Sequence, residues 1–296
     1  MELREAANGI IVNIAKREKT DTVIPPMMVV LVLLSYAVVI TYYATTMYRE
    51  YGHGIPATQL FSLVALFMIG VGLIVALFYL LMSRNARHSE RERELRHYMI
   101  EYAEANNYVC GADISNGIQR LKDIDAEILS EEDPAFHKNR LMYIGLPAIA
   151  GTLALMFVDL ETYAIQLVAI CYGVSVVLAI FIAPSITVFP RQHEKRAIPF
   201  YDEFNDIAAC LSIKTEKFEN RIGYRSFWVF LLASVLTLGL FVIYWGYLTF
   251  NDMNRHFLEQ WYYEDILFRS VKSTETYFVE TETERGKGYK LEDHWT

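Results

Sequence analysis

Two short segments of the sequence carry the residue spacing of a metal site. Glu50 and His53 stand three positions apart, which places two ligand side chains on one face of a helix. A two-metal helical bundle needs several such carboxylates, and the apolar segments supply none, so a solvated turn explains this pair better. His193 precedes Glu194 as in zinc metalloproteases, but Ala197 stands where those enzymes have their second histidine. We therefore predict no metal ligands, no catalytic residues and no bound cofactor.

Two groups of neighbouring carboxylates have side chains suited to a cation. They are Asp202, Glu203 and Asp206, and Glu264 with Asp265. Neighbouring carboxylates on a helix in water usually form its solvated face. An enzyme at the inner membrane interface would use Asp202, Glu203, His193 or Glu264, and this set contains no identifiable pair of nucleophile and base. The sequence therefore favours a protein that is not an enzyme.

A basic cluster directly follows the fourth apolar stretch of the chain. Arg191, Lys195 and Arg196, together with His193, are placed to bind lipid phosphates. The alternative is a plain cytoplasmic anchor, because Lys and Arg are enriched where membrane helices enter the cytoplasm. Both interpretations place these side chains at the inner surface of a membrane.

The elements that must position these residues are dominated by five apolar stretches without Asp, Glu, Lys, Arg or His. They are Ile24–Tyr48, Pro56–Ser83, Leu141–Val158, Tyr163–Pro190 and Phe227–Phe250. A hydrocarbon core of about 30 Å needs roughly 20 apolar residues in a helix, and charge is costly inside it. The sequence predicts an all-α, multi-pass integral membrane protein with two transmembrane helical hairpins, a fifth hydrophobic helix and amphipathic cytoplasmic helices. The lipid bilayer is its first expected partner.

The distribution of Lys and Arg predicts a cytoplasmic N-terminus in the cell membrane. Four lie before the first apolar stretch, eight in 86–140 and seven in 191–225, whereas the other two connections contain only Arg49. A full crossing by 227–250 would put 251–296 outside, although that tail has six Lys or Arg. Gly239 allows the alternative of a helix that breaks and returns as a shallow hairpin. The sequence leaves both topologies open.

Amphipathic segments outside the apolar stretches predict cytoplasmic helices. Their apolar stripes comprise Leu95, Tyr98, Met99 and Tyr102; Ile114, Ile118, Leu121 and Ile128; and Ile198, Tyr201, Phe204, Ile207, Ala208, Leu211 and Phe218. We expect these faces to pack within the chain, with the membrane surface and a partner protein as alternatives. The predicted segments are a cytoplasmic N-terminus 1–22, a transmembrane hairpin 23–85, a cytoplasmic helical hairpin 86–138, a transmembrane hairpin 139–190, an amphipathic helix 191–224, the fifth segment 225–252, and a helix with a polar tail 253–296.

Small residues within the apolar stretches predict close packing of helices. They are Gly145, Ala148, Gly151, Ser175, Ala179, Ala183 and Gly239. Such residues let helix backbones approach, either within one chain or between copies. We therefore expect a homo-oligomer or a larger membrane protein complex. The net charge of −8 and the lack of a basic stripe argue against a nucleic-acid partner.

One segment of the chain is similar to a known family. An Arg before the fifth apolar stretch, the turn Thr237-Leu238-Gly239, the pair Tyr244-Trp245 and the polar run Asn251-Asp252-Met253-Asn254 follow one another. This order resembles the uncharacterised prokaryotic membrane family called domain of unknown function 4234, over about residues 225–260. Phe241 stands where that family tends to have a tyrosine. The resemblance implies a prokaryotic membrane origin and assigns no activity.

These patterns favour a non-enzymatic membrane scaffold or accessory subunit that self-associates or joins a larger membrane complex. The alternative is a transporter or pore for an uncharged solute or a lipid. Uncharged routes through helical membrane proteins exist, so the lack of charge in the apolar stretches does not exclude this alternative. A polar cavity between the helices would favour the transporter.

Overall fold

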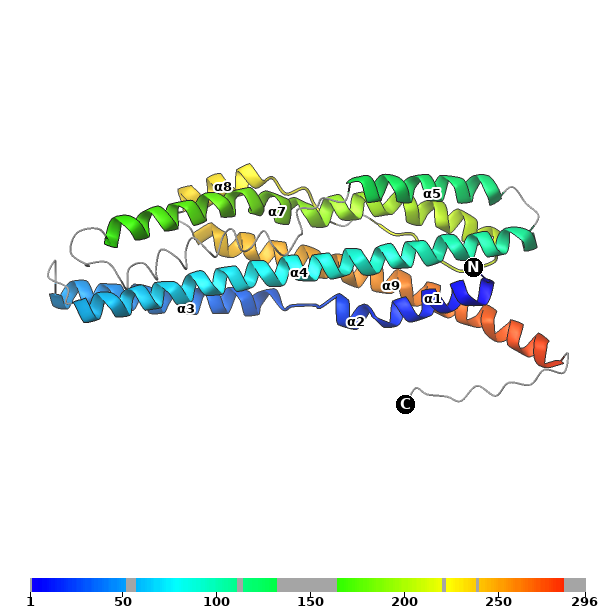
Figure 1. Cartoon of the computed structure of the whole chain (residues 1–296), viewed down its shortest axis with the longest axis horizontal. Coiled ribbons are helices and arrows are strands. Elements are labelled where there is room, and N and C mark those ends of the chain that lie inside the picture. The colour runs from blue at the N-terminus through cyan, green and yellow to red at the C-terminus, as the bar shows by residue number, and fades with distance from the viewer. Residues whose placement is uncertain are drawn as a thin grey trace.

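The computed structural model describes residues 2–51, 57–110, 114–131, 164–219, 222–237 and 240–284, and within them all regular structure is helical (Figure 1). The helices are α1 (Leu3–Ala15), α2 (Arg17–Thr20), α3 (Pro26–Tyr51), α4 (Ala57–Cys110), α5 (Ile114–Glu131), α7 (Ala164–Cys210), α8 (Phe227–Leu236) and α9 (Leu240–Glu284). The all-α prediction is confirmed for these ranges. The helices lie roughly along one long axis (Figure 1).

The bundle has two halves of different chemistry. We call residues 24–83, 164–190 and 225–250 the apolar half, and residues 2–23, 84–131, 191–219 and 251–284 the charged half, within the described ranges. Helices α4, α7 and α9 run through both halves without a break, and α7 does so with three prolines inside it. The predicted segment boundaries at 85 and 190 are therefore not helix ends. Instead, the helices that would cross a membrane continue directly into the charged half.

The charged half has a conventional hydrophobic core. Helix α1 packs on α4 and α9, and α5 packs on α4 and α7, so that the apolar faces meet inside the chain. The predicted stripes supply much of the core, including the fully buried Leu95, Met99, Leu121, Tyr201 and Phe204. Of the three partners considered for these faces, the structure supports packing within the chain, since periodic apolar faces stabilise helices mainly through tertiary contact.

Helix α7 ends in a turn that sends the chain back along the bundle. The Ile213 N–H donates to the Ala208 carbonyl (2.9 Å) and the Ser212 N–H donates to the Ala209 carbonyl (3.2 Å). Ser212 has φ of 59°, the left-handed conformation that such helix ends require. The segment that follows buries Phe218 against Tyr201, with ring centroids 5.0 Å apart. This return segment thereby closes one side of the charged half.

The fifth apolar stretch is not one continuous helix. Helix α8 ends at Leu236, α9 begins at Leu240, and the two pack on each other. The Phe230 ring lies 5.5 Å from Phe241 and 5.7 Å from Trp245. At the open end, Arg225 and Asp252 form a two-contact ion pair at 2.9 and 3.2 Å. Helices α8 and α9 thus form a helical hairpin, which is the geometry that the re-entrant alternative requires.

Within the described residues, one helix is long and apolar enough to cross a membrane. It is Pro26–Glu50, and 6 % of its 18-residue apolar window is buried. A signal sequence near an N-terminus meets the same criteria of length and composition. Four other predicted crossings are not shown. Of these, the described residues 57–83 and 164–190 belong to longer helices, 227–236 and 240–250 belong to α8 and α9, and 141–158 lies outside the described residues. The structure thus supports one membrane segment by composition, and the multi-pass anchor is treated as a proposal below.

The residues predicted to mediate helix packing fall partly outside the described ranges. Gly145, Ala148, Gly151 and Gly239 lie outside them. Ser175 and Ala179 belong to α7, but their side chains are not described. Ala183 is partly exposed and lines an apolar groove between α3, α4, α7 and α9.

Helix α5 supplies a matched test of this core. Leu121 is fully buried and Leu129, two turns later on the same helix, is 41 % exposed. We expect Leu121→Ala to lower the free energy of unfolding by about 2–5 kcal/mol, and Leu129→Ala to change it by less than about 0.5 kcal/mol. Unfolding of the full chain in mild detergent, followed by circular dichroism, checks this. Equal effects of the two substitutions would contradict the packing of α5 described here.

Candidate functional site

Three histidines from three different helices meet in the charged half, next to its border with the apolar half. They are His88 on α4, His193 on α7 and His256 on α9, with exposed fractions of 0, 6 and 0 %. Each offers one ring nitrogen within 4.8 Å of the others. Their ring centroids are 5.0 to 5.2 Å apart. The meeting follows from the long helices, because each histidine lies within six residues of the end of an apolar run, at a similar depth along the bundle.

Buried carboxylates surround the three imidazoles. Asp21 Oδ1 lies 3.0 Å from His88 Nδ1, and Glu92 Oε2 lies 2.6 Å from His193 Nε2 and 4.0 Å from His88 Nε2. The second oxygen of Glu92 accepts a hydrogen bond from the Tyr201 hydroxyl at 3.1 Å. Asp21 and Glu92 are both fully buried, so their charges require partners inside the protein.

Glu194, next to His193 in sequence, faces the third histidine. Its Oε1 lies 3.9 Å from His256 Nδ1, and its Oε2 accepts a hydrogen bond from the Ile222 N–H at 3.2 Å. The side chain of Glu194 is fully buried. Through this contact, the return segment after α7 is tied to the same cluster.

A shell of arginines neutralises most of these carboxylates. Arg91 lies between Asp21 (2.6 Å) and Glu264 (2.8 Å), and Arg96 lies between Glu92 (3.6 Å) and Asp125 (2.6 Å). Arg84 donates to the Asn254 side chain at 2.8 Å and stacks over the rings of Phe250 and Phe257. Around the histidines, four buried carboxylates (Asp21, Glu92, Glu194 and Glu264) face three buried guanidinium groups (Arg84, Arg91 and Arg96).

The pKa values of two side chains at the centre follow from this arrangement. Burial lowers the pKa of His88 to about 4, although Asp21 acts in the opposite direction, so His88 is neutral at pH 7. Burial alone would raise the pKa of Asp21, but His88, Arg91 and Trp261 outweigh it and hold this pKa well below its usual range. Since the Asp21 carboxylate only accepts hydrogen bonds, His88 carries its proton on Nδ1. Its Nε2 therefore presents a lone pair to the centre of the cluster.

The pKa values of Glu92 and Glu264 shift in opposite directions although both side chains are buried. Burial alone would raise the pKa of Glu92, but His193, Arg96 and His88 outweigh burial and keep this carboxylate ionised. At Glu264, burial raises the pKa to about 7 against the opposing effects of Arg91 and Arg17, with Asp21 adding to the rise. The Glu264 carboxyl thus titrates near neutral pH.

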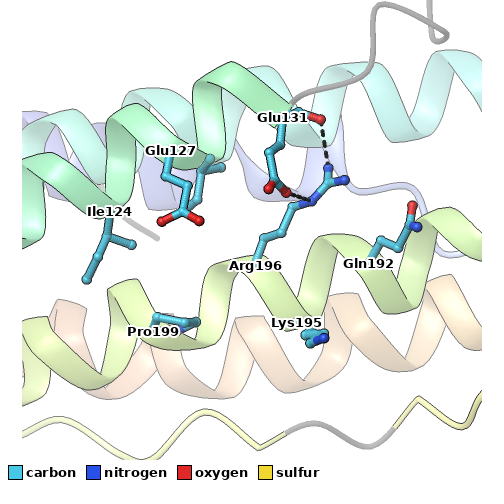
Figure 2. A pocket seen from close by; sticks show the side chains of 8 residues that line it. Ile124, Glu127, Glu131, Gln192, Lys195, Arg196 and Pro199 are labelled. Atoms are coloured by element: carbon cyan, nitrogen blue, oxygen red, sulfur yellow. Dashed lines mark hydrogen bonds and ion pairs between the residues drawn. The ribbon is translucent and has the colours of Figure 1, made fainter.

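The basic residues predicted for lipid phosphate have separate partners. Arg196 Nε contacts a carboxylate oxygen of Glu131 at 2.8 Å and its Nη1 donates to the Glu131 carbonyl at 3.0 Å (Figure 2). The guanidinium of Arg191 lies over the Tyr224 ring, 5.0 Å from its centroid. Lys195 is exposed at the rim of the cavity that Figure 2 shows, which Glu127 and Glu131 also line. These partners do not gather the three cations around one phosphate.

The carboxylates considered for an enzyme do not converge either. Glu203 pairs with Arg120 at 2.7 Å, and Asp265 pairs with Arg17 at 2.7 Å. Glu50 is exposed at the end of α3, and His53 lies outside the described residues. Among the sequence candidates, His193, Glu194 and Glu264 enter the buried cluster.

Sequence reasoning missed His88, Glu92 and His256, and it set aside His193 and Glu194 because they lack a metalloprotease pattern. A local signal existed for one pair, since His88 and Glu92 stand four residues apart on one helix face. A second signal was the repetition of a histidine shortly after the apolar runs that end at Ser83, Pro190 and Phe250. Long helices that lie side by side bring residues at the same distance from their apolar runs close together.

Comparisons with models of known protein families, with curated proteins and with solved structures found no match. The cluster is therefore interpreted from its own geometry. The likeness of residues 225–260 to a prokaryotic membrane family stays a hypothesis.

The Arg91 ion pairs give a first test of the cluster. Arg91→Ala leaves Asp21 and Glu264 buried next to each other without their shared cation. We expect a loss of about 3–5 kcal/mol in the free energy of unfolding, because removing one partner of a buried ion pair leaves the other charge buried and unpaired. Arg93→Ala, an exposed position on the same helix, is the control and should change it by less than about 0.5 kcal/mol. Thermal unfolding in detergent measures both.

Glu264 gives a prediction of pH dependence. Its pKa is about 7 in the folded chain and about 4.5 in the unfolded chain, so the folded state holds the proton more tightly. Protonation of Glu264 therefore stabilises the folded chain by about 3 kcal/mol. This stabilisation is complete below pH 4.5 and is lost as the pH rises through 7. We expect the Tm of the wild type to fall relative to that of Glu264→Gln between pH 5 and 8. The control is Asp265→Asn, which should follow the wild type, and parallel profiles for Glu264→Gln and the wild type would refute the assignment.

Proposed function

We propose that this protein is a non-enzymatic membrane scaffold or accessory subunit, held in the cytoplasmic membrane by a multi-pass helical anchor. The observation that carries this proposal is the unbroken passage of α4, α7 and α9 from the apolar half into the charged half. Rigid helices that leave a membrane and continue into a packed bundle hold that bundle at a fixed distance and orientation. This is the arrangement expected of a platform on which other subunits assemble.

The exposed surface of the apolar half supports burial in lipid. Val38, Trp228, Leu236 and Leu240 are each between 66 and 75 % exposed. Proteins that are monomeric in water rarely expose contiguous apolar surface of this kind. A bilayer or neighbouring helices would cover it. The resemblance of residues 225–260 to a prokaryotic membrane family agrees with this environment.

The hairpin of α8 and α9 supports a single cytoplasmic location for all basic segments. In this arrangement the charged part of α9 packs against α1. Next to it, Arg17 of α2 contacts Asp265 of α9 at 2.7 Å. The described basic residues of this segment, Arg255, Arg269 and Lys272, then lie on the same side as the N-terminus. Such a topology would be consistent with the enrichment of positive charge in the cytoplasm, which a fifth crossing would not be.

The closure of the histidine cluster supports a role that is not enzymatic. Its three imidazoles and its carboxylates are each at most 6 % exposed, so no substrate has direct access to them. The carboxylates that do reach solvent, such as Glu203 and Asp265, are engaged in separate ion pairs. Substrate turnover would need both access and convergent groups.

One observation favours the second candidate, a transporter or pore for a lipid or an uncharged solute. A groove of about 440 Å³ in the apolar half is lined by side chains from four helices, including Leu33, Leu77, Ile186 and Trp245. A lipid chain matches this lining better than a polar solute does. Exchange of labelled lipid between the leaflets of vesicles that hold the purified protein would favour the transporter over the scaffold.

The natural cysteines provide a test of the anchor and its orientation. Cys210 is exposed at the end of α7 in the charged half. In a C110S, C171S background, we expect a membrane-impermeant maleimide to label Cys210 only after the cells are permeabilised. Glu50→Cys in the same background with C210S is the matched control, and it should react in intact cells.

Membrane association itself is checked on the same samples. The protein should float with vesicles and remain in them after carbonate washing. Extraction by carbonate, or labelling of Cys210 in intact cells, would contradict the anchor or its orientation. The scaffold also predicts particles larger than one 34.2 kDa chain in mild detergent, by native mass spectrometry. A strictly monomeric particle without companions would refute association.

A further inference from the structure

Beyond the scaffold function, we propose that His88, His193, His256 and Glu92 bind one divalent transition-metal ion of the zinc class inside the charged half. The three imidazoles, from α4, α7 and α9, each offer a ring nitrogen within 4.8 Å of the others, and Glu92 Oε2 lies next to two of them, those of His193 and His88. The ion would cross-link the three helices that pass between the two halves.

The distances between the ligand atoms fit a tetrahedral site. Bonds of about 2.0–2.1 Å from zinc to imidazole or carboxylate imply ligand atoms about 3.3 Å apart. Here His88 Nε2 lies 3.1 Å from His256 Nε2, while Glu92 Oε2 lies 4.0 Å from His88 Nε2 and 2.6 Å from His193 Nε2. These three separations lie on both sides of the ideal value, and the remaining distances between histidine nitrogens are within 4.8 Å.

The proton positions on two histidines leave a place for a cation. His88 donates from Nδ1 to Asp21, so its Nε2 lone pair points at His256 Nε2. His256 is placed in a matching way, since its Nδ1 lies 3.9 Å from Glu194 Oε1 and its Nε2 lies 3.1 Å from His88 Nε2. An ion bound by both Nε2 atoms would leave each Nδ1–H directed at a carboxylate.

Two of the ligand atoms face each other directly at the centre. Glu92 Oε2 and His193 Nε2 are buried and lie 2.6 Å apart. Coordination of one ion by both atoms would replace this direct contact.

The surroundings of the four ligands match those of protein metal sites. Asp21 accepts from His88 Nδ1 and Glu194 faces His256 Nδ1, which are carboxylate–histidine contacts of the kind that orient metal ligands. The other oxygen of Glu92 is held by the Tyr201 hydroxyl.

The ligand types select the class of metal. Three imidazoles and one carboxylate suit zinc and similar divalent ions, whereas copper(I) prefers sulfur ligands and magnesium or calcium prefer oxygen ligands. Four protein ligands with almost no exposure form a closed site, as in structural zinc centres, which keep no position open for substrate. The ion would therefore stabilise the bundle.

The test uses the full chain, purified in detergent through a tag without histidine. After removal of metal with a chelator, the wild type should take up one equivalent of Zn²⁺ or Co²⁺ per chain. Co²⁺ should give the strong visible absorption of tetrahedral coordination. Zn²⁺ should raise the Tm of the metal-free protein.

Variants identify the ligands. His193→Ala and His256→Ala should each weaken Zn²⁺ binding by more than 100-fold, and Asp21→Asn by about 10–100-fold because it only orients a ligand. His97→Ala is the matched control, since His97 is exposed on α4, and it should bind like the wild type. Helical content and particle size of each variant show whether it has folded. If the variants do not fold, X-ray absorption of the Zn²⁺-loaded wild type must show nitrogen and oxygen ligands with several imidazoles.

The proposal fails if the wild type holds less than one tenth of an equivalent after loading, or if His97→Ala loses as much metal as the ligand variants. Folded His193→Ala and His256→Ala that retain wild-type affinity would also overturn it. Flotation with vesicles is measured in parallel. A protein that floats without binding metal would refute this site and leave the membrane scaffold intact.

Discussion

The arrangement of the charged half depends on the neutralisation of buried charge. Arg91 is the clearest case, because one guanidinium on α4 faces Asp21 from the N-terminal segment and Glu264 from α9. An ionised group costs several kcal/mol to remove from water, and only close partners offset that cost. The three segments must therefore be in place together. Trp261 reinforces the arrangement, since its indole N–H donates to the second oxygen of Asp21 at 3.1 Å.

The apolar half has a core of its own. Among the described side chains this core is the cluster around Val29, Met82 and Phe250, whereas the core of the charged half extends over five helices. If the apolar half lies in lipid, as proposed above, the hydrophobic effect would not drive its helices together, and packing there would rely on shape and on polar contacts. The Trp245 indole N–H donates to the Thr187 hydroxyl at 2.9 Å, a contact of this kind between α9 and α7.

Much of the fold could be predicted because it rests on local properties of the sequence. The period of Leu95, Met99 and Tyr102, or of Tyr201 and Phe204, marks a buried helix face whichever partner covers it. The continuity of α4 through the border at Ser83 was not predicted, since a change from apolar to charged residues suggests a boundary although helix propensity continues across it. The packing of α8 on α9 stayed open because it rests on contacts between residues far apart in the sequence, such as Arg225 and Asp252, which lie 27 residues apart.

The histidine cluster could not be predicted because its contacts join residues even farther apart in the sequence. His88 and His256 are separated by 168 residues, and Asp21 and Trp261 by 240. A single sequence shows each as a polar residue on an amphipathic helix, where the solvated face is the ordinary explanation. The sequence shows only how many residues separate each histidine from the end of its apolar run, and this number indicates which residues lie at the same level of the bundle. The inference that polar residues at one depth converge requires the long helices to be nearly parallel, which Figure 1 shows.

A buried polar cluster at this border also restricts how the helices can slide. Apolar faces in lipid tolerate a shift by one helical turn, because one Leu or Val contact replaces another at little cost. A shift of about 5.4 Å between α4 and α9 would separate Arg91 from Glu264 and Arg84 from Asn254 at once, and each would be left without its partner. We infer that the cluster fixes the register of α4, α7 and α9, as single buried polar residues do in coiled coils. Fixed register is what the proposed platform would need, since it would set which residues of the charged half face a partner.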